Sequence, residues 1–535
     1  MQRPSSEVGT GEANAYADEL RSWRERRGLS KRALADLMAY DRTYVSHIEG
    51  CNLVPTEDFT RRAETALDAG GALWRRWDAL LAARSSRPPR TARRDDRELR
   101  TADFVAWLAD HSASDFRETY DAVAAAFDRL DHGRSADRRH RAYRRASVPR
   151  AAVASALTRY YEDAGEAHGV QLYRASVGQG AGEIVLSVLV EPTALGVAVP
   201  LGGSRESVGF VRRPSPSPCT TQLGVVEHKA AIARLAQVEA SDTVMVNNPL
   251  YRLLHAEVMP DRLAATFTLS DFATYALTAD LLEVELLDAI CESDTDGKPE
   301  RTPLRDRLLP TVATATALDA RECVGGTVSL LAIARPERPG RAKDYALLIQ
   351  ERSSKVLNVT GRLAVIPKAF HQPTVDPAEE AALATTLLRE LEEELLGRQD
   401  LEHLDPESLR LADPLHARHR SPPLTWLLDH EDTDALRMEC TAFGINLVTG
   451  NYEFGCLTVI EDDQWWDRFG HQVEANWETM RVHRYSSLDT DGLAALATDN
   501  RWSNEGLFAF LEGLRRLTEL DDSGRVAAPT ITLEI

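Results

Sequence analysis

The sequence predicts a multidomain fold with an all-α N-terminal domain, a helical linker, an α/β middle domain and an α/β C-terminal domain. Three observations predict it. The chain has 535 residues, whereas a typical domain has about 150. Its first 85 residues carry only helical patterns, whereas strand-like apolar runs alternate with helical runs from residue 169 onward. A segment rich in Pro, Ser and Arg separates these two parts.

The predicted boundaries follow these changes in pattern. They are a tail at 1–14, the all-α domain at 15–83, a basic linker with helices at 84–148, the middle domain at 149–320, the C-terminal domain at 321–520 and a tail at 521–535.

The composition is that of a globular protein in a reducing compartment. Hydrophobic residues make up 43% and charged residues 27% of the chain, which excludes a collagen-like, coiled-coil or wholly disordered chain. The six cysteines form no CxxC pair, which argues against a zinc ribbon or a disulfide scaffold. The longest apolar stretch, 184–201, is interrupted by Glu191 and Pro192 and predicts two strands rather than a membrane span. We therefore expect a cytoplasmic protein with no membrane partner.

The charge is unevenly distributed along the chain. Residues 1–150 contain 28 Lys and Arg against 24 Asp and Glu, a net charge of +4, whereas the rest carries −24. The whole-chain charge of −20 argues against nucleic-acid binding, but the basic N-terminal part keeps that function open. The 57 Arg against 6 Lys indicate a GC-rich bacterial genome.

The pattern of the N-terminal part predicts five short helices. A helix over 15–27 ends at Gly28, and Ser30 caps a second helix over 31–38. After a tight turn, a third helix covers 42–49. Further helical stretches follow Pro55 and begin near residue 70. Two short helices joined by a turn of three to four residues are typical of a helix-turn-helix motif.

The motif residues make the resemblance specific. The second helix carries a Leu-Ala pair, the third ends in apolar-Ser-x-Ile-Glu-x-Gly, and a proline follows. The chain thus resembles the Cro/C1-type (XRE family) helix-turn-helix regulators, with Ala39 in place of the usual turn glycine. The residues that carry the resemblance are Leu34, Ala35, Val45, Ser46, Ile48, Glu49, Gly50 and Pro55.

This resemblance implies double-stranded DNA as the partner, with no cofactor required for DNA binding. The third helix of such a motif lies in the major groove, and the module acts as a dimer on two half-sites. We therefore expect a homodimer. Arg42 is placed to read guanine, Lys31 and Arg32 to contact phosphates, and Glu49 to serve the structure of the domain. The predicted DNA-binding residues are Lys31, Arg32, Arg42, Thr43, Tyr44 and His47.

The middle of the chain offers no catalytic set. The GQGAG segment at 178–182 lies between two strand-like runs and predicts a hairpin turn rather than a phosphate loop. A basic cluster at 138–150 either faces DNA or contacts the acidic C-terminal part. We expect the domain at 149–320 to be a sensor or scaffold.

A helix predicted from Asp376 to about Leu396 carries the strongest chemical signal of the C-terminal part. Glu390, Glu393 and Glu394 share one arc of this helix beside its apolar seam. Carboxylates gathered in this way favour a hard divalent cation such as Mg²⁺, which could bridge a pyrophosphate and activate water. The alternative is an exposed acidic helix face.

The same helix resembles half of the signature of the Nudix hydrolases. The R-E-U-x-E-E half is matched at Arg389, Glu390, Leu391, Glu393 and Glu394, on a helix that follows two strands. The chain departs from the signature elsewhere, because Lys368 and Ala369 replace its glycines and Ala381 its upstream glutamate. A Nudix-like fold with these changes could bind a nucleotide-derived small molecule without cleaving it.

Together these patterns predict a transcriptional regulator. Its helix-turn-helix domain would bind a specific DNA sequence, and its Nudix-like domain would bind a nucleotide-like ligand that modulates DNA binding. Two alternatives remain. The protein could be a Mg²⁺-dependent nucleoside-diphosphate pyrophosphohydrolase with an attached helix-turn-helix, or a scaffold whose helix-turn-helix binds protein.

Overall fold

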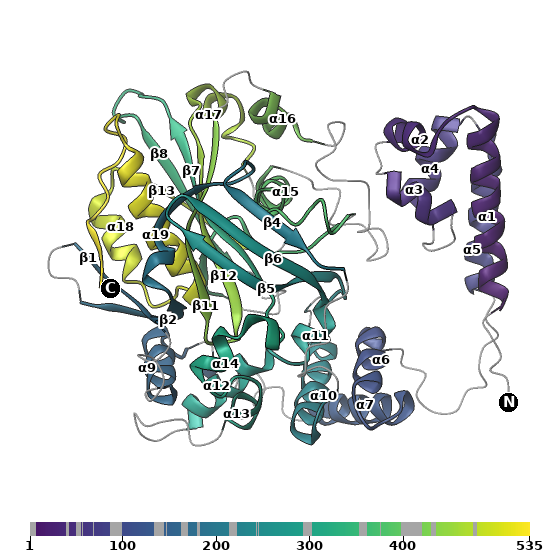
Figure 1. Ribbon diagram of the computed structural model, residues 1–535, viewed down its shortest axis with the longest axis horizontal. Coiled ribbons are helices and arrows are strands. Elements are labelled where there is room, and N and C mark those ends of the chain that lie inside the picture. Colours follow the sequence, from purple (N-terminus) through teal and green to yellow (C-terminus); the bar gives the residue numbers. More distant parts are fainter. Residues whose placement is uncertain are drawn as a thin grey trace. The chain divides into compact units, whose positions relative to one another are not determined.

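The computed structural model divides the chain into two compact units (Figure 1). The first comprises residues 1–98, 374–380 and 399–421, and the second comprises 99–373, 381–398 and 422–535. Within them the structure describes residues 7–38, 42–49, 55, 57–67, 69–85, 99–132, 144–145, 147–161, 169–178, 182–212, 222–241, 243, 245–292, 302–352, 361–374, 376–396, 420–429, 435–473 and 479–534.

The first unit contains the five predicted helices. They pack around one apolar core, which includes Leu20 of the first helix, Leu34 and Met38 of the second, and Val45 and Ile48 of the third. The first helix begins at Glu7, so part of the predicted tail at 1–14 is helical. The helices are α1 (Glu7–Arg26), α2 (Lys31–Met38), α3 (Arg42–Glu49), α4 (Glu57–Leu67) and α5 (Ala72–Ser85).

The second unit is a mixed α/β body around an 11-stranded sheet. Its pairings are antiparallel except between β7 and β12. Its main path runs β13 (Thr479–Ser486), β8 (Asp344–Arg352), β7 (Gly325–Arg335), β12 (Asn451–Ile460), β11 (Leu436–Asn446), β2 (Ile184–Val190), β1 (Gln171–Val177) and β14 (Ile531–Leu533), with β3 (Leu195–Pro200), β9 (Leu363–Val365) and β10 (Lys368–Phe370) paired at its sides.

One helix, α19 (Asn504–Leu520), covers one face of this sheet (Figure 1). Its apolar side chains pack with those of β7 and β12 in one core cluster. The backbones of α19 and β7 approach closely, since a Cβ on Gly513 would lie 2.8 Å from Leu330 Cβ. Strands β7 and β12 are tighter still at Gly325, where a Cβ would lie 1.9 Å from the carbonyl oxygen of Tyr452, and β7 and β10 at Gly326, where a Cβ would lie 1.7 Å from the carbonyl oxygen of Ala369. Glycine is therefore required at Gly325.

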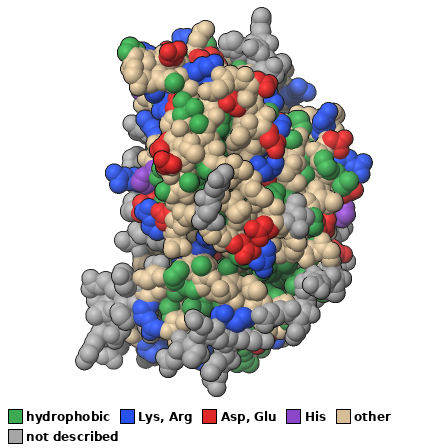
Figure 2. Space-filling view, turned by 90° about the vertical axis from the view of Figure 1, so that its left-hand side faces the viewer, with side chains coloured by type: hydrophobic (Ala, Val, Ile, Leu, Met, Phe, Trp, Pro, Cys, Tyr) green, Lys and Arg blue, Asp and Glu red, His purple; other side chains and the backbone are tan. Residues whose placement is uncertain are grey.

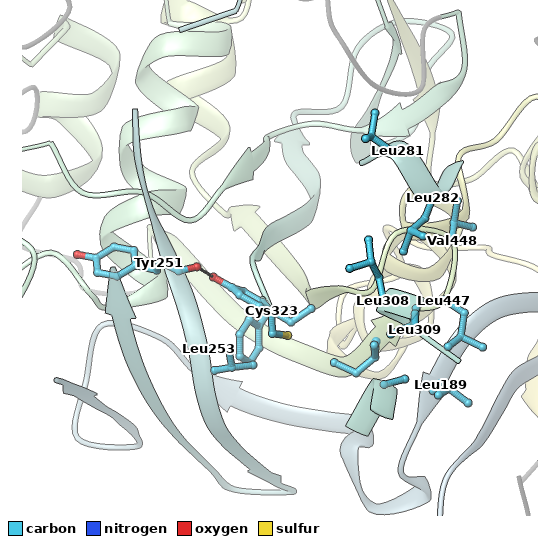
Figure 3. Close-up of a cluster of buried hydrophobic side chains, with 14 of the residues drawn as sticks. Leu189, Tyr251, Leu253, Leu281, Leu282, Leu308, Leu309, Cys323, Leu447 and Val448 are labelled. Atoms are coloured by element: carbon cyan, nitrogen blue, oxygen red, sulfur yellow. Dashed lines mark hydrogen bonds between the residues drawn. The ribbon is translucent and has the colours of Figure 1, made fainter. Parts of the chain in front are cut away.

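The opposite face of the sheet is buried by a second layer. A three-stranded sheet orders β4 (Glu206–Phe210), β6 (Arg262–Asp271) and β5 (Pro249–Met259). Figure 3 shows Tyr251, Leu253 and Cys323 on one side of this core and leucines from β2, the helices and the β11–β12 hairpin on the other. The helices of the body are α6 (Ala102–Asp110), α7 (Phe116–His132), α9 (Arg150–Tyr160), α10 (Val225–Glu239), α11 (Phe272–Ala276), α12 (Leu281–Glu292), α13 (Pro303–Leu308), α14 (Val312–Thr316), α15 (Leu383–Leu395), α16 (Pro422–Asp429), α17 (Asp463–Phe469) and α18 (Thr490–Ala497).

Long-range pairing joins segments that the sequence pattern separates. The boundary predicted at residue 320 runs through one sheet, because β2 and β3 pair with β11. Within the segment predicted as a tail at 521–535, β14 pairs with β1. The predicted hairpin is present as the antiparallel pair β1 and β2, although residues 179–181 of its turn lie outside the described part.

The helix predicted from Asp376 begins later than expected, at Leu383. The carboxylate of Glu380 accepts hydrogen bonds from the backbone N–H groups of Thr374 and Asp376 at 2.7 and 2.5 Å. These bonds close a turn in place of the first helical turns. No helix in the described part of the chain combines the length and apolarity needed to cross a bilayer.

Candidate nucleic-acid interface

The start of α2 is set by two local signals. Gly28 adopts φ +67° just after α1 and donates its N–H to the carbonyl of Glu25 at 2.9 Å, as expected at the end of a helix. Ser30 then caps α2, since its Oγ accepts the N–H of Ala33 at 3.0 Å. The predicted end of the first helix and start of the second are confirmed.

The rotation of α3 is set by its buried positions. Val45 and Ile48 pack against Leu34, Ala35 and Met38 of α2. Helical geometry therefore turns positions 43 and 47 toward the opposite side of α3, the side that the sequence predicts to face DNA. The side chains of Arg42, Thr43, Tyr44 and His47 lie outside the described part of the structure.

A buried ion-pair network fastens α3 to α1. Glu49 is 1% exposed, and its carboxylate oxygens lie 2.5 and 3.1 Å from Nε and Nη2 of Arg24. The hydrogen bond with Glu49 raises the pKa of the Arg24 guanidinium, despite burial that acts to lower it. Arg21 Nε also lies 3.8 Å from the same carboxylate. Glu49 therefore holds α3 against α1, which supports the prediction that Glu49 serves the structure of the domain.

The two predicted phosphate contacts at the start of α2 differ in their surroundings. Lys31 Nζ donates to Ser46 Oγ at 3.2 Å and lies 3.5 Å from Glu49 Oε2. Its side chain thus bridges α2 to α3. Arg32 is exposed and extends from the first turn of α2, where the backbone N–H groups of a helix favour anions.

Residues 15–77 match a family model described as a helix-turn-helix domain. The first unit contains a helix-turn-helix domain. A search of curated proteins found no match to the chain. The helix-turn-helix domain implies a DNA partner.

Basic residues that follow the helix-turn-helix domain in the sequence are engaged within the second unit. Arg145 pairs with Asp288 of α12 at 2.5 Å, and Arg150 donates to the carbonyl of Val185 at 3.0 Å. Of the two interpretations of the cluster at 138–150, the Arg145–Asp288 pair agrees with a contact to the acidic part of the chain, whereas residues 138–143 and 146 lie outside the described part. On the face drawn in Figure 2, the coloured basic and acidic side chains are interspersed rather than separated by sign.

Two of the three glutamates predicted to hold a metal contact other groups in the described structure. Glu390 lies 3.3 Å from Nη2 of Arg389, and Glu394 accepts the backbone N–H of Lys368 at 3.0 Å. Glu393 is partly exposed. No group of three or more His, Cys, Asp and Glu side chains among the described residues could hold a metal ion. The Mg²⁺ site at Glu390, Glu393 and Glu394 stays a prediction.

The α/β body contains a polar centre that the sequence patterns do not predict. Lys368, Glu453 and Glu505 come together at the N-terminus of α19. They are separated by dozens of residues in the sequence and lie on three different elements, so no motif spacing could have linked them. Only their tertiary neighbourhood identifies them.

Proposed function

We propose that this protein is a sequence-specific transcriptional regulator that binds duplex DNA as a homodimer through its helix-turn-helix domain. The match over residues 15–77 carries this proposal. The fixed rotation of α3 supports it, because Val45, Ile48 and Glu49 are buried and leave the opposite side of the helix to the major groove.

The charge distribution suggests how the domain orients toward DNA. The second unit contains most of the acidic residues, since residues beyond 150 carry a net charge of −24. Repulsion between this part and phosphates would leave the N-terminal part, whose residues 1–150 carry a net charge of +4, as the part that approaches DNA. Binding would then depend strongly on salt, because neutralised phosphates release counterions.

The test is selection of a duplex from random sequences, followed by anisotropy titrations of the full chain between 50 and 200 mM salt. We expect a loss of orders of magnitude in affinity over this range. Arg32→Ala should weaken binding to all duplexes alike and reduce the salt slope by about one. Arg42→Ala should instead relax the preference at one base pair, because a bidentate arginine contact to guanine contributes about 1–3 kcal/mol of discrimination.

Arg76→Ala is the matched control, because Arg76 is an arginine of α5 that lies 3.5 Å from Glu19 and is 45% exposed. The same titrations should leave its affinity close to that of wild type. A chain that selects no duplex sequence, or binds with no salt dependence, would refute the proposal. That result would favour the alternative in which the helix-turn-helix domain binds a protein.

A further inference from the structure

Three cationic side chains gather around one buried carboxylate of the helix-turn-helix domain. Glu49, at the end of α3, is 1% exposed. Arg24 donates hydrogen bonds to both of its carboxylate oxygens, at 2.5 and 3.1 Å. Arg21 Nε and Lys31 Nζ lie 3.8 and 3.5 Å from one of these oxygens, Oε2. One negative charge thus faces three positive charges.

The three cations differ in exposure, and this difference divides their roles. The side chain of Arg24 is 10% exposed, whereas those of Arg21 and Lys31 are 44% and 37% exposed. Arg24 pairs with Glu49 through two hydrogen bonds, the strongest arrangement for an arginine and a carboxylate. The positive charges of Arg21 and Lys31 are therefore only partly compensated by Glu49, and solvent reaches both.

Two exposed carboxylates also lie near this cluster. Asp18 Oδ1 is 3.1 Å from Nη1 of Arg21, and Asp18 is 72% exposed. The exposed Glu25 pairs with Arg24. Ion pairs at such exposed positions are weak, and salt screens them. An anion held close to the domain can therefore replace Asp18 beside Arg21.

Contacts with α3 fix both exposed cations in place. Arg21 Nη2 donates to the backbone carbonyl of Glu49, and Lys31 Nζ donates to Ser46 Oγ at 3.2 Å. A guanidinium group has five N–H donors and an ammonium group has three, so both side chains keep donors for a further acceptor. Because the two groups are already ordered, binding an anion costs little additional side-chain entropy.

The two cations are close enough to share one phosphate group. Both lie within 3.8 Å of the same carboxylate oxygen. A phosphate accepts charge-assisted hydrogen bonds of about 2.7–2.9 Å on separate oxygens. It can thus accept one bond from each side chain at the same time.

The pair also borders the side of α3 that the sequence predicts to enter the major groove. Ser46, the partner of Lys31, lies one turn from position 43, and residues three apart are neighbours on a helix surface. Lys31 is the first residue of α2, the helix that crosses the DNA backbone in this motif. Phosphates flank the groove at this point.

We propose that Arg21 and Lys31 together bind one phosphate of the DNA backbone. The inference rests on the proposed DNA binding. It adds a contact from α1, a helix from which the sequence predicts none, and it joins Arg21 and Lys31 in one contact. Glu49 and Arg24 position this contact from beneath and do not touch DNA.

The salt dependence of DNA binding tests the proposal. Anisotropy titrations of the full chain with its selected duplex compare wild type with Arg21→Ala, Lys31→Ala and the double variant. Loss of one phosphate contact reduces the slope of log affinity against log salt by about 0.9. We expect this reduction in the double variant, which corresponds to about eightfold weaker binding at 100 mM salt if the affinities meet at 1 M.

Replacing single phosphates of the duplex by neutral methylphosphonates locates the contact. At one position the replacement should weaken binding of wild type about as much as the double substitution does. The same replacement should leave the affinity of the double variant nearly unchanged, because the contact is already lost. This comparison separates a contact to DNA from a general loss of domain stability.

Two control variants separate charge from structure. Arg26→Ala removes an arginine of α1 that is 54% exposed and donates to Ser22 Oγ at 2.7 Å, and it should bind like wild type. Arg21→Lys keeps the positive charge and should retain most of the salt slope. Thermal unfolding checks each variant, and Lys31→Ala with the methylphosphonate duplexes decides the question if Arg21→Ala does not fold.

The outcomes distinguish this inference from the function on which it rests. A wild-type chain that selects no duplex would end both. Specific, salt-dependent binding by wild type, with an unchanged slope in the folded double variant, would overturn this inference alone. A reduction of about 1.8 in the slope would assign the two cations to separate phosphates and would equally overturn the shared contact, as would a methylphosphonate scan with the same profile in both proteins.

Discussion

The substitution Glu49→Gln isolates the ion pair that holds α3 against α1. It keeps the size of the side chain and removes its charge, so the guanidinium of Arg24, whose side chain is 10% exposed, loses its buried counterion. Removing one partner of a buried ion pair costs about 3–5 kcal/mol. Arg24 keeps a hydrogen bond to the carbonyl of Leu29 at 2.9 Å, which places the expected cost near the lower limit, at about 3 kcal/mol.

Other cations near Glu49 change this expectation little. Arg21 and Lys31 are 44% and 37% exposed, and exposed ion pairs contribute only about 0–1 kcal/mol. A loss of about 3 kcal/mol raises the opening equilibrium of α3 about a hundredfold. DNA affinity should fall as well, because the opened domain no longer presents α3 to the groove.

Hydrogen exchange of the full chain, followed by mass spectrometry of peptides from α1 to α3, measures this change. The matched control is Glu25→Gln, since Glu25 also lies near Arg24, at 3.3 Å, but is 62% exposed. We expect the control to change protection less than threefold, in line with about 0.5 kcal/mol. Equal protection in the two variants would refute the structural role of Glu49.

Three further predictions concern the α/β body. The pKa of Glu453 is raised in the folded state to about 8 from an ordinary value of 4.5, so folding takes up a proton, and the contribution of Glu453 to the free energy of unfolding is fully present below pH 4.5 and is lost as the pH rises toward 8. In urea unfolding, the free energy of unfolding of wild type should therefore fall relative to that of Glu453→Gln between pH 5 and 8. Parallel pH curves for the two proteins would contradict this. Gly325→Ala should prevent folding or lower the melting temperature sharply, because its Cβ would lie 1.9 Å from the carbonyl oxygen of Tyr452, whereas Gly203→Ala, with no atom within 4 Å, should melt like wild type. Glu394→Gln should lower the free energy of unfolding in urea by about 1–2 kcal/mol, because it replaces a charged acceptor of the Lys368 N–H. If wild type instead hydrolyses nucleoside diphosphates with Mg²⁺ and this substitution abolishes the turnover, the predicted metal site is established.

Local signals in the sequence were sufficient to predict the helices of the helix-turn-helix domain and their buried sides. Gly28 ends α1, Ser30 caps α2, and the apolar spacing of Leu34, Val45 and Ile48 predicts which sides of the helices are buried. Each of these signals acts over one or two helical turns, so the sequence shows it directly. A match over residues 15–77 agrees with this prediction.

The start of α15 shows where local signals fail. Asp376, Pro377 and Glu379 form a helix-start pattern in the sequence, but Glu380 satisfies the backbone of a turn instead. The helix begins only at Leu383, where the carboxylate of Glu206 accepts the backbone N–H. A partner 177 positions away in the sequence cannot be read from a local pattern.

The sequence by itself determined the helix-turn-helix domain and the α/β character of the rest. Tertiary structure decided that the strands of residues 171–200 and 325–533 form one sheet, since β1 pairs with β14 across more than 350 residues. It also decided which partners surround each buried carboxyl group. Glu439 and Glu453 lie on adjacent strands, but Glu439 forms an ion pair with Arg516, whereas Glu453 shares Lys368 with Glu505, and burial raises the pKa of Glu453. The charge of a buried group depends on neighbours that only the fold brings into contact.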